Sequence, residues 1–190
     1  MKRNILLIAV LLLSSLLIAC GKPEKIQTAD SLDPSTAVSD TDGELPDNFA
    51  EAREREDFVV LGNDNQLLRG ELWEAFLDAA ARNEEARVII ARATVEGDPI
   101  YYHLTYRDNR YILFPDYTHD RFGAELAKQA EEKEYTTLER LETDRSVDYI
   151  LTNEPFGSDE AYAEYWERIR SQTVTPDRTF EILINLAKEY

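Results

Sequence analysis

Three closely spaced apolar segments between residues 88 and 114 constrain the fold of this chain more than any other feature. Residues 88–95 are rich in β-branched side chains, and residues 100–106 alternate between two sets of side chains, as strands do. The turn residues Glu96-Gly97-Asp98-Pro99 separate them, and Asp108-Asn109 leads into a third apolar segment at residues 111–114. The sequence therefore predicts an antiparallel meander of three strands.

Further strand and helix patterns lie on either side of the meander. Three more segments are strand candidates, namely residues 58–61, 135–141 and 147–152. Apolar residues at helical spacing predict a helix over residues 68–80. Ser158 and Thr175-Pro176 are typical first residues of helices, and they predict two C-terminal helices.

These patterns together predict the fold class. We expect an α+β fold in which an antiparallel sheet of five or six strands has one helix packed on a face, with the two C-terminal helices beside it. The chain has one cysteine, so no intramolecular disulfide can form. A single domain over residues 57–190 must therefore be held together by its hydrophobic core.

The N-terminus has the pattern of a secretory signal. Lys2-Arg3 precedes an apolar run over residues 5–18 that is too short for a membrane-spanning helix. Leu17-Ile18-Ala19-Cys20 then resembles the lipobox of bacterial lipoproteins, and its cysteine is the only one in the chain. We expect residues 1–19 to be removed and Cys20 to carry lipid that anchors the protein on the extracytoplasmic face of the cell membrane.

Acidic and small polar residues dominate the segment after the lipobox. Residues 20–56 are mainly Asp, Glu, Ser, Thr and Pro, which predicts a flexible tether. The formal net charge of the chain is −17, and the clustered Lys and Arg that nucleic-acid binding requires are missing. We therefore exclude nucleic acid as a partner. Because an acidic domain is repelled by anionic headgroups, we expect membrane contact only through the lipid on Cys20.

Several of these segments resemble a known family. The residues that carry the resemblance are Val88-Ile89-Ile90, Thr94-Val95-Glu96-Gly97-Asp98-Pro99-Ile100, Leu104-Thr105-Tyr106 and Asp120-Arg121-Phe122-Gly123. They are similar to the pattern of a small uncharacterised lipoprotein family of Gram-positive, Bacillus-type bacteria, over residues 57–152. The resemblance implies a small α+β domain outside the cytoplasmic membrane and no chemistry. The chain departs from the family at Thr136, Thr137 and Thr152, near which the family has cysteines, and in its C-terminal helices.

The strongest polar cluster lies at residues 116–121. His119-Asp120 resembles the metal-binding pair of a phosphohydrolase superfamily, but the further His and Asp ligands that such a site needs are missing. We therefore predict no metal, no cofactor and no catalytic residue, and we interpret Asp116 and Asp120 as caps of a loop. An envelope hydrolase that uses Asp116, His119 and Asp120 is the alternative hypothesis.

Aromatic residues are dense between Ile100 and Phe122. If Tyr101 and Tyr111 share an uncovered sheet face, they form a flat tyrosine surface for a peptide or a glycan; alternatively, tyrosines simply fit the strands. The leading hypothesis is a non-enzymatic lipoprotein module that binds an envelope protein or polymer. Its candidate ligand-binding residues are Tyr101, Tyr111, Asp116, His119 and Asp120.

Overall fold

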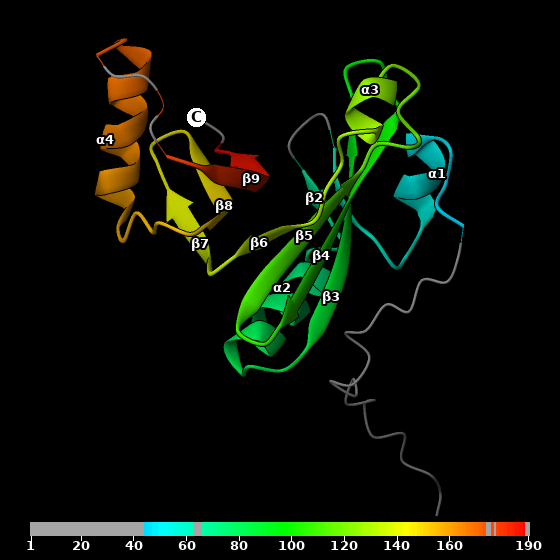
Figure 1. Ribbon diagram of the computed structural model, residues 1–190, viewed down its shortest axis with the longest axis horizontal. Helices are drawn as coiled ribbons and strands as arrows, with labels where there is room; N and C mark the ends of the chain where they lie inside the picture. The colour runs from blue at the N-terminus through cyan, green and yellow to red at the C-terminus, as the bar shows by residue number, and fades with distance from the viewer. Residues whose placement is uncertain (1–43, 63–65, 174–175, 177, 189–190) are drawn as a thin grey trace, which may run out of the picture. The chain divides into compact units, whose positions relative to one another are not determined.

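The computed structural model describes residues 44–62, 66–173, 176 and 178–188 (Figure 1). The predicted signal peptide, Cys20 and most of the predicted tether lie outside the described residues. The described part of the chain forms two sheets, here called sheet A and sheet B, and four helices. The α+β class is therefore confirmed, while the arrangement of strands differs from the prediction.

Sheet A contains the predicted meander. Its strands are β1 (Val59–Leu61), β2 (Leu67–Leu68), β3 (Ala86–Ala93), β4 (Pro99–Arg107), β5 (Arg110–Asp116) and β6 (Lys133–Tyr135), in the spatial order β2-β1-β3-β4-β5-β6. β3, β4 and β5 are antiparallel neighbours, as predicted, and Leu104 of β4 lies between Val88 and Leu113. Gly97 has a φ of 92° in the first turn, a conformation that glycine adopts without strain.

Sheet A is mixed, so the prediction of a purely antiparallel sheet is wrong. β1 runs parallel to β3, with Val60 opposite Ala91. The chain passes through α2 (Gly70–Ala81) between these two strands, and this crossover returns it in its original direction. Val59 and Val60 point to opposite faces of the sheet and both are buried, which is typical of a strand in a parallel pair.

α2 confirms the predicted helix and packs on one face of sheet A. Trp73 and Phe76 are almost completely buried, and their rings stack with centroids 5.6 Å apart. They join the main core with apolar side chains from β1, β3, β4 and β5. Trp73 is therefore a core residue.

Sheet B is a second sheet that the sequence patterns did not separate from the first. Its strands are β7 (Thr137–Glu142), β8 (Ser146–Thr152) and β9 (Phe180–Ala187), in the order β7-β8-β9. The hairpin of β7 and β8 corresponds to the last two predicted strands. The predicted second C-terminal helix is wrong, because Phe180–Ala187 pairs antiparallel with β8 instead. Pairing with β8 satisfies the backbone groups on one edge of β9, and the strand buries Leu183 and Ile184 at the same time.

The first C-terminal helix is confirmed as α4 (Asp159–Arg170). The Ser158 Oγ accepts a hydrogen bond from the Ala161 N–H at 3.2 Å, so Ser158 is the predicted N-cap. α4 covers one face of sheet B, where Tyr162 packs with Leu141 and Ile150. The other face contributes Tyr149, Leu151 and Leu183 to the main core. Sheet B is therefore buried on both faces.

The folded region begins earlier than the predicted boundary at residue 57. α1 (Phe49–Glu54) is a short helix whose N-cap is Asn48. Leu45, Phe49 and Ala52 pack on the face of sheet A opposite α2, in a second core cluster. These residues belong to the fold rather than to a tether, because burying them repays the entropy of ordering the backbone. The fourth helix, α3 (Ala124–Ala127), follows β5.

Candidate functional site

The predicted polar cluster forms a loop between β5 and α3 in which the carboxylates cap the backbone. The Asp116 Oδ1 accepts hydrogen bonds from the Thr118 N–H at 2.8 Å and from its hydroxyl at 2.6 Å. The Asp120 Oδ1 accepts one from the Phe122 N–H at 2.9 Å. Both aspartates therefore serve the loop itself, as the capping interpretation proposed.

His119 contacts the chain that precedes α1. Its Nδ1 lies 3.0 Å from the Asp47 Oδ1, and its ring meets the Tyr101 ring edge-on with centroids 5.4 Å apart. The Tyr101 hydroxyl donates to the Pro46 carbonyl at 2.7 Å. His119 and Tyr101 thus hold residues 46–47 against sheet A. Within the described residues, no hydrogen bond or ion pair links the His119 ring to Asp116 or Asp120.

Tyr101 and Tyr111 do not share an open face, so that part of the prediction is wrong. Tyr101 lies opposite Asp116, whereas Tyr111 lies opposite Tyr106, and these pairs point to different faces of sheet A. Tyr101 has no exposed surface, because the segment before α1 covers it. Tyr111 is half-buried on the α2 side, with its ring centroid 4.9 Å from that of Tyr106. Burial raises the pKa of both phenols.

An ion pair between the buried Asp98 carboxylate and the exposed Arg121 guanidinium fastens this loop to the β3–β4 turn. Asp98 is 4% exposed and receives the Arg121 guanidinium, whose Nη2 lies 2.6 Å from the Asp98 Oδ1. The Arg121 backbone N–H also donates to Asp98, at 3.2 Å. The hydrogen bonds from Arg121 hold the pKa of Asp98 below its usual value. The sequence analysis placed Asp98 in a turn, but nothing local in the sequence indicates that Arg121 is its partner.

A second buried carboxylate, Asp148 on β8, joins three elements around sheet B. Its oxygens accept hydrogen bonds from the Tyr162 hydroxyl of α4 at 2.7 Å and from the Ser146 hydroxyl at 3.2 Å. The Asn185 amide of β9 is a third donor. Burial raises the pKa of Tyr162, and the hydrogen bond between its hydroxyl and Asp148 raises that pKa further. Asp148 is 4% exposed and well supplied with donors, so it stabilises the fold and presents no open site.

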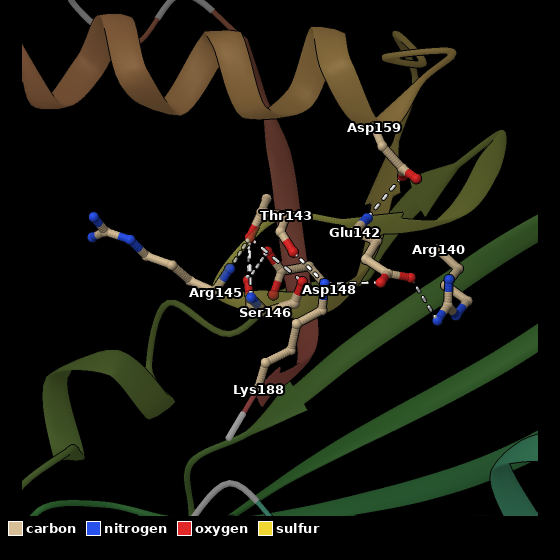
Figure 2. Close-up of polar contacts among 8 residues, drawn as sticks. All are labelled: Arg140, Glu142, Thr143, Arg145, Ser146, Asp148, Asp159 and Lys188. Atoms are coloured by element: carbon tan, nitrogen blue, oxygen red, sulfur yellow. Dashed lines mark hydrogen bonds and ion pairs between the residues drawn. The ribbon is translucent and has the colours of Figure 1, made fainter. Parts of the chain in front are cut away.

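Figure 2 shows the polar contacts around the turn between β7 and β8, where the Ser146 hydroxyl donates to Asp148. The Thr143 hydroxyl accepts hydrogen bonds from the backbone N–H groups of Arg145 and Ser146. The Lys188 ammonium reaches back to the Thr143 carbonyl and lies 2.8 Å from the Glu142 Oε1. The hydrogen bonds of the Thr143 hydroxyl and carbonyl fix the backbone of the turn, and the ion pair of Lys188 with Glu142 ties the end of β9 to β7, so this cluster is structural.

Aromatic and charged side chains gather where β9 meets sheet A. We call this group the tyrosine junction; it consists of Arg92, Tyr102, Tyr117, Lys133, Tyr135 and Glu181. The Arg92 guanidinium carbon lies 5.7 Å from the centre of the Tyr102 ring, and its Nη1 lies 3.4 Å from the Ile182 carbonyl of β9. The Lys133 ammonium lies 4.0 Å from the Glu181 carboxylate.

The tyrosine junction keeps hydrogen-bonding capacity that the fold does not use. In the described part of the chain, the hydroxyls of Tyr117 and Tyr135 have no hydrogen-bond partner, and Arg92 forms no ion pair. Tyr117 is half-buried, whereas Tyr135 is 5% exposed and packs in the main core. Burial and the nearby Glu181 raise the pKa values of Tyr102, Tyr117 and Tyr135. The phenols are therefore protonated donors at neutral pH.

Comparisons with protein-family models, curated proteins and solved structures found no match to this chain. In the part of the chain that the structure describes, no group of three or more His, Cys, Asp or Glu side chains is placed to hold a metal ion. None of the helices within the described ranges has the length and apolar character needed to cross a bilayer. The case for function therefore rests on the residues themselves.

His103 makes the stability of the fold depend on pH. Burial lowers the pKa of its imidazole below the ordinary histidine value of about 6.5. The unfolded chain therefore binds a proton more readily, so stability is full above about pH 6.5 and falls as the pH drops toward the folded-state pKa. We expect His103→Leu to flatten the decline of melting temperature between about pH 6.5 and 5, where carboxylates contribute little. The chain has two histidines, and a His119→Gln control should keep the decline. A His103→Leu protein with an unchanged decline would refute this assignment.

Proposed function

We propose that this protein is a lipid-anchored lipoprotein on the extracytoplasmic face of the cell membrane, and that its folded part is a non-enzymatic binding module. The observation that carries the binding role is the tyrosine junction, where the half-buried Tyr117 phenol and Arg92 guanidinium keep hydrogen-bonding capacity that the described part of the fold does not use. Tyrosine suits a recognition surface because it has a large apolar ring and a polar end.

The junction replaces the surface proposed from the sequence. Tyr101 and Tyr111 were the tyrosines proposed from the sequence, but the half-buried tyrosine within electrostatic range of Arg92 is Tyr117. Tyr102 and Tyr135 are buried in the main core. Three other residues support the binding function by positioning neighbouring backbone. Asp116 and Asp120 hold the loop, and His119 holds the segment before α1. An envelope hydrolase built on these residues has less support, since their side chains have separate partners.

The anchoring half of the proposal rests on Leu17-Ile18-Ala19-Cys20 and the apolar run before it. The resemblance of residues 57–152 to an uncharacterised lipoprotein family agrees with it. Lipid on Cys20 would hold the binding module close to its envelope partner, which raises the local concentration of the two and allows modest affinity to suffice.

One experiment tests both halves of the proposal. Cells make the full-length chain with a C-terminal tag, incorporate a clickable fatty acid, and are treated with a cross-linker before the protein is isolated from the envelope. Wild type should take up the fatty acid and give a specific cross-linked partner. Cys20→Ala should lose the fatty acid, and Tyr117→Ala should keep the fatty acid while losing most of the partner.

The control variant is Phe122→Ser, which changes a 74% exposed apolar side chain outside the tyrosine junction. It should keep both the fatty acid and the partner. Fatty acid on the Cys20→Ala protein would overturn the anchoring proposal. Equal capture by wild type and Tyr117→Ala would overturn the binding role of the junction, and turnover of an envelope substrate that vanished in His119→Gln would favour the hydrolase.

A further inference from the structure

We propose that the tyrosine junction binds the C-terminal carboxylate of an extended peptide, and that Arg92 is the residue that receives this carboxylate. The inference rests on the proposed binding function and specifies its ligand. It follows from three features of the junction: the charge of Arg92, which forms no ion pair within the described residues, the nearby Tyr117 phenol, and the open backbone edge of β9.

Arg92 is a half-buried cation that forms no ion pair with a carboxylate in the part of the chain that the structure describes. Its guanidinium is held against the Tyr102 ring, and one of its N–H groups faces the Ile182 carbonyl at the long distance of 3.4 Å. A guanidinium has five N–H donors in a planar fork that matches the two oxygens of a carboxylate. Because water is partly excluded there, a carboxylate on Arg92 gains more than it would at a fully exposed arginine.

Neighbouring groups favour a single negative charge. The Tyr117 phenol is half-buried, lies within electrostatic range of Arg92 and has no hydrogen-bond partner among the described residues, so its hydroxyl is a donor available to an anion. Glu181 also acts on Tyr117 and Tyr102, so its negative charge lies in the same junction. A second negative charge on the ligand would be repelled by Glu181, which favours a carboxylate over a phosphate dianion.

The edge of sheet B favours a peptide over a glycan. β9 is an outer strand, since the order of the sheet is β7-β8-β9. Within the described residues, β9 forms no backbone hydrogen bond to a strand other than β8. An extended peptide can pair with such an edge through its own backbone. The contact between Arg92 and Ile182 places the guanidinium beside this strand, where the end of an added peptide strand would lie.

The test uses the full chain in detergent micelles, with ¹⁵N-labelled amide signals followed by NMR. The probes are N-acetylated tetra-alanine with a free carboxylate, the same peptide with a C-terminal amide, glucuronic acid and inorganic phosphate. We expect the carboxylate peptide to bind about tenfold or more tightly than the amide peptide, which corresponds to about 1.4 kcal/mol. The shifted signals should come from β9 and the residues around Arg92.

Two variants and one control separate binding from folding. Arg92→Gln should abolish the preference for the carboxylate peptide, and Arg92→Lys should keep part of it because a lysine preserves the charge but not the planar fork. Arg110→Gln is the matched control, since Arg110 is an exposed arginine in β5 outside the junction, and it should bind like wild type. Melting temperatures of all three variants check that they are folded.

The outcomes distinguish this inference from the proposed function. Equal binding of the carboxylate and amide peptides, or a full preference retained in Arg92→Gln, would overturn the role of Arg92. Binding of glucuronic acid without binding of either peptide would overturn the peptide class, and preferential binding of phosphate would overturn the carboxylate. In each of these cases, capture that depends on Tyr117 in the envelope would still support the binding module itself.

Discussion

Replacing Tyr162 with alanine is expected to lower the free energy of unfolding by about 3–5 kcal/mol, as for other large buried aromatic side chains. Tyr162 has no exposed surface and is the largest α4 side chain that is fully buried against sheet B. Its ring packs edge-on against Phe156, with centroids 4.9 Å apart, and its hydroxyl donates to Asp148. Alanine would remove this packing and leave a buried carboxylate with one donor fewer. Urea unfolding of the full chain measures the change.

The conservative variant Tyr162→Phe separates the ring from the hydroxyl. It keeps the packing and removes the hydrogen bond to Asp148, so we expect a smaller loss of about 1.5–3 kcal/mol, typical of hydrogen bonds to charged groups. Faster amide exchange in α4 should accompany both losses, because Tyr162 ties this helix to β8. If Tyr162→Phe were as stable as wild type, the hydroxyl would not stabilise Asp148 as described.

Replacing Trp73 with alanine is expected to cost a similar amount, about 3–5 kcal/mol. Trp73 lies in the main core, where its ring stacks on Phe76 of α2 and meets Tyr149 of β8 edge-on at 5.2 Å. It is therefore a direct contact between α2 and sheet B. The truncated protein should show a lower urea midpoint by circular dichroism, together with weakened protection of both α2 and β8.

The variant Trp73→Phe should behave very differently. The indole Nε1 is buried, and within the described part of the chain it has no hydrogen-bond partner, so this donor costs stability where it stands. Phenylalanine keeps most of the ring contact and removes the donor. We expect the two effects nearly to cancel, with a net change within about 1 kcal/mol. A loss as large as that of Trp73→Ala would show that the indole nitrogen is not a liability.

Local patterns were sufficient where the stabilising contacts are themselves local. Gly97 and its neighbours predicted the first turn of the meander, and Ser158 predicted the start of α4, because a turn or a cap involves residues only a few positions apart. The apolar stripe over residues 68–80 predicted α2 for the same reason.

Patterns failed where two structures fit the same residues. In Phe180–Ala187, the apolar positions agree with a helix as well as with a strand over so short a stretch. Pairing with β8 decided in favour of β9. The parallel pairing of β1 with β3 and the division into two sheets were likewise decided by partners distant in the chain.

The sequence by itself therefore determined the meander, two of the helices and a fold held by its core without a disulfide. The tertiary structure alone decided which side chains are free to bind. Tyr101 and Tyr102 are adjacent in the chain, yet Pro46 covers the first and Arg92 lies over the second. Arg92 in turn meets Ile182, ninety residues away. Burial and ion pairing depend on such distant contacts, and no local period or spacing encodes them.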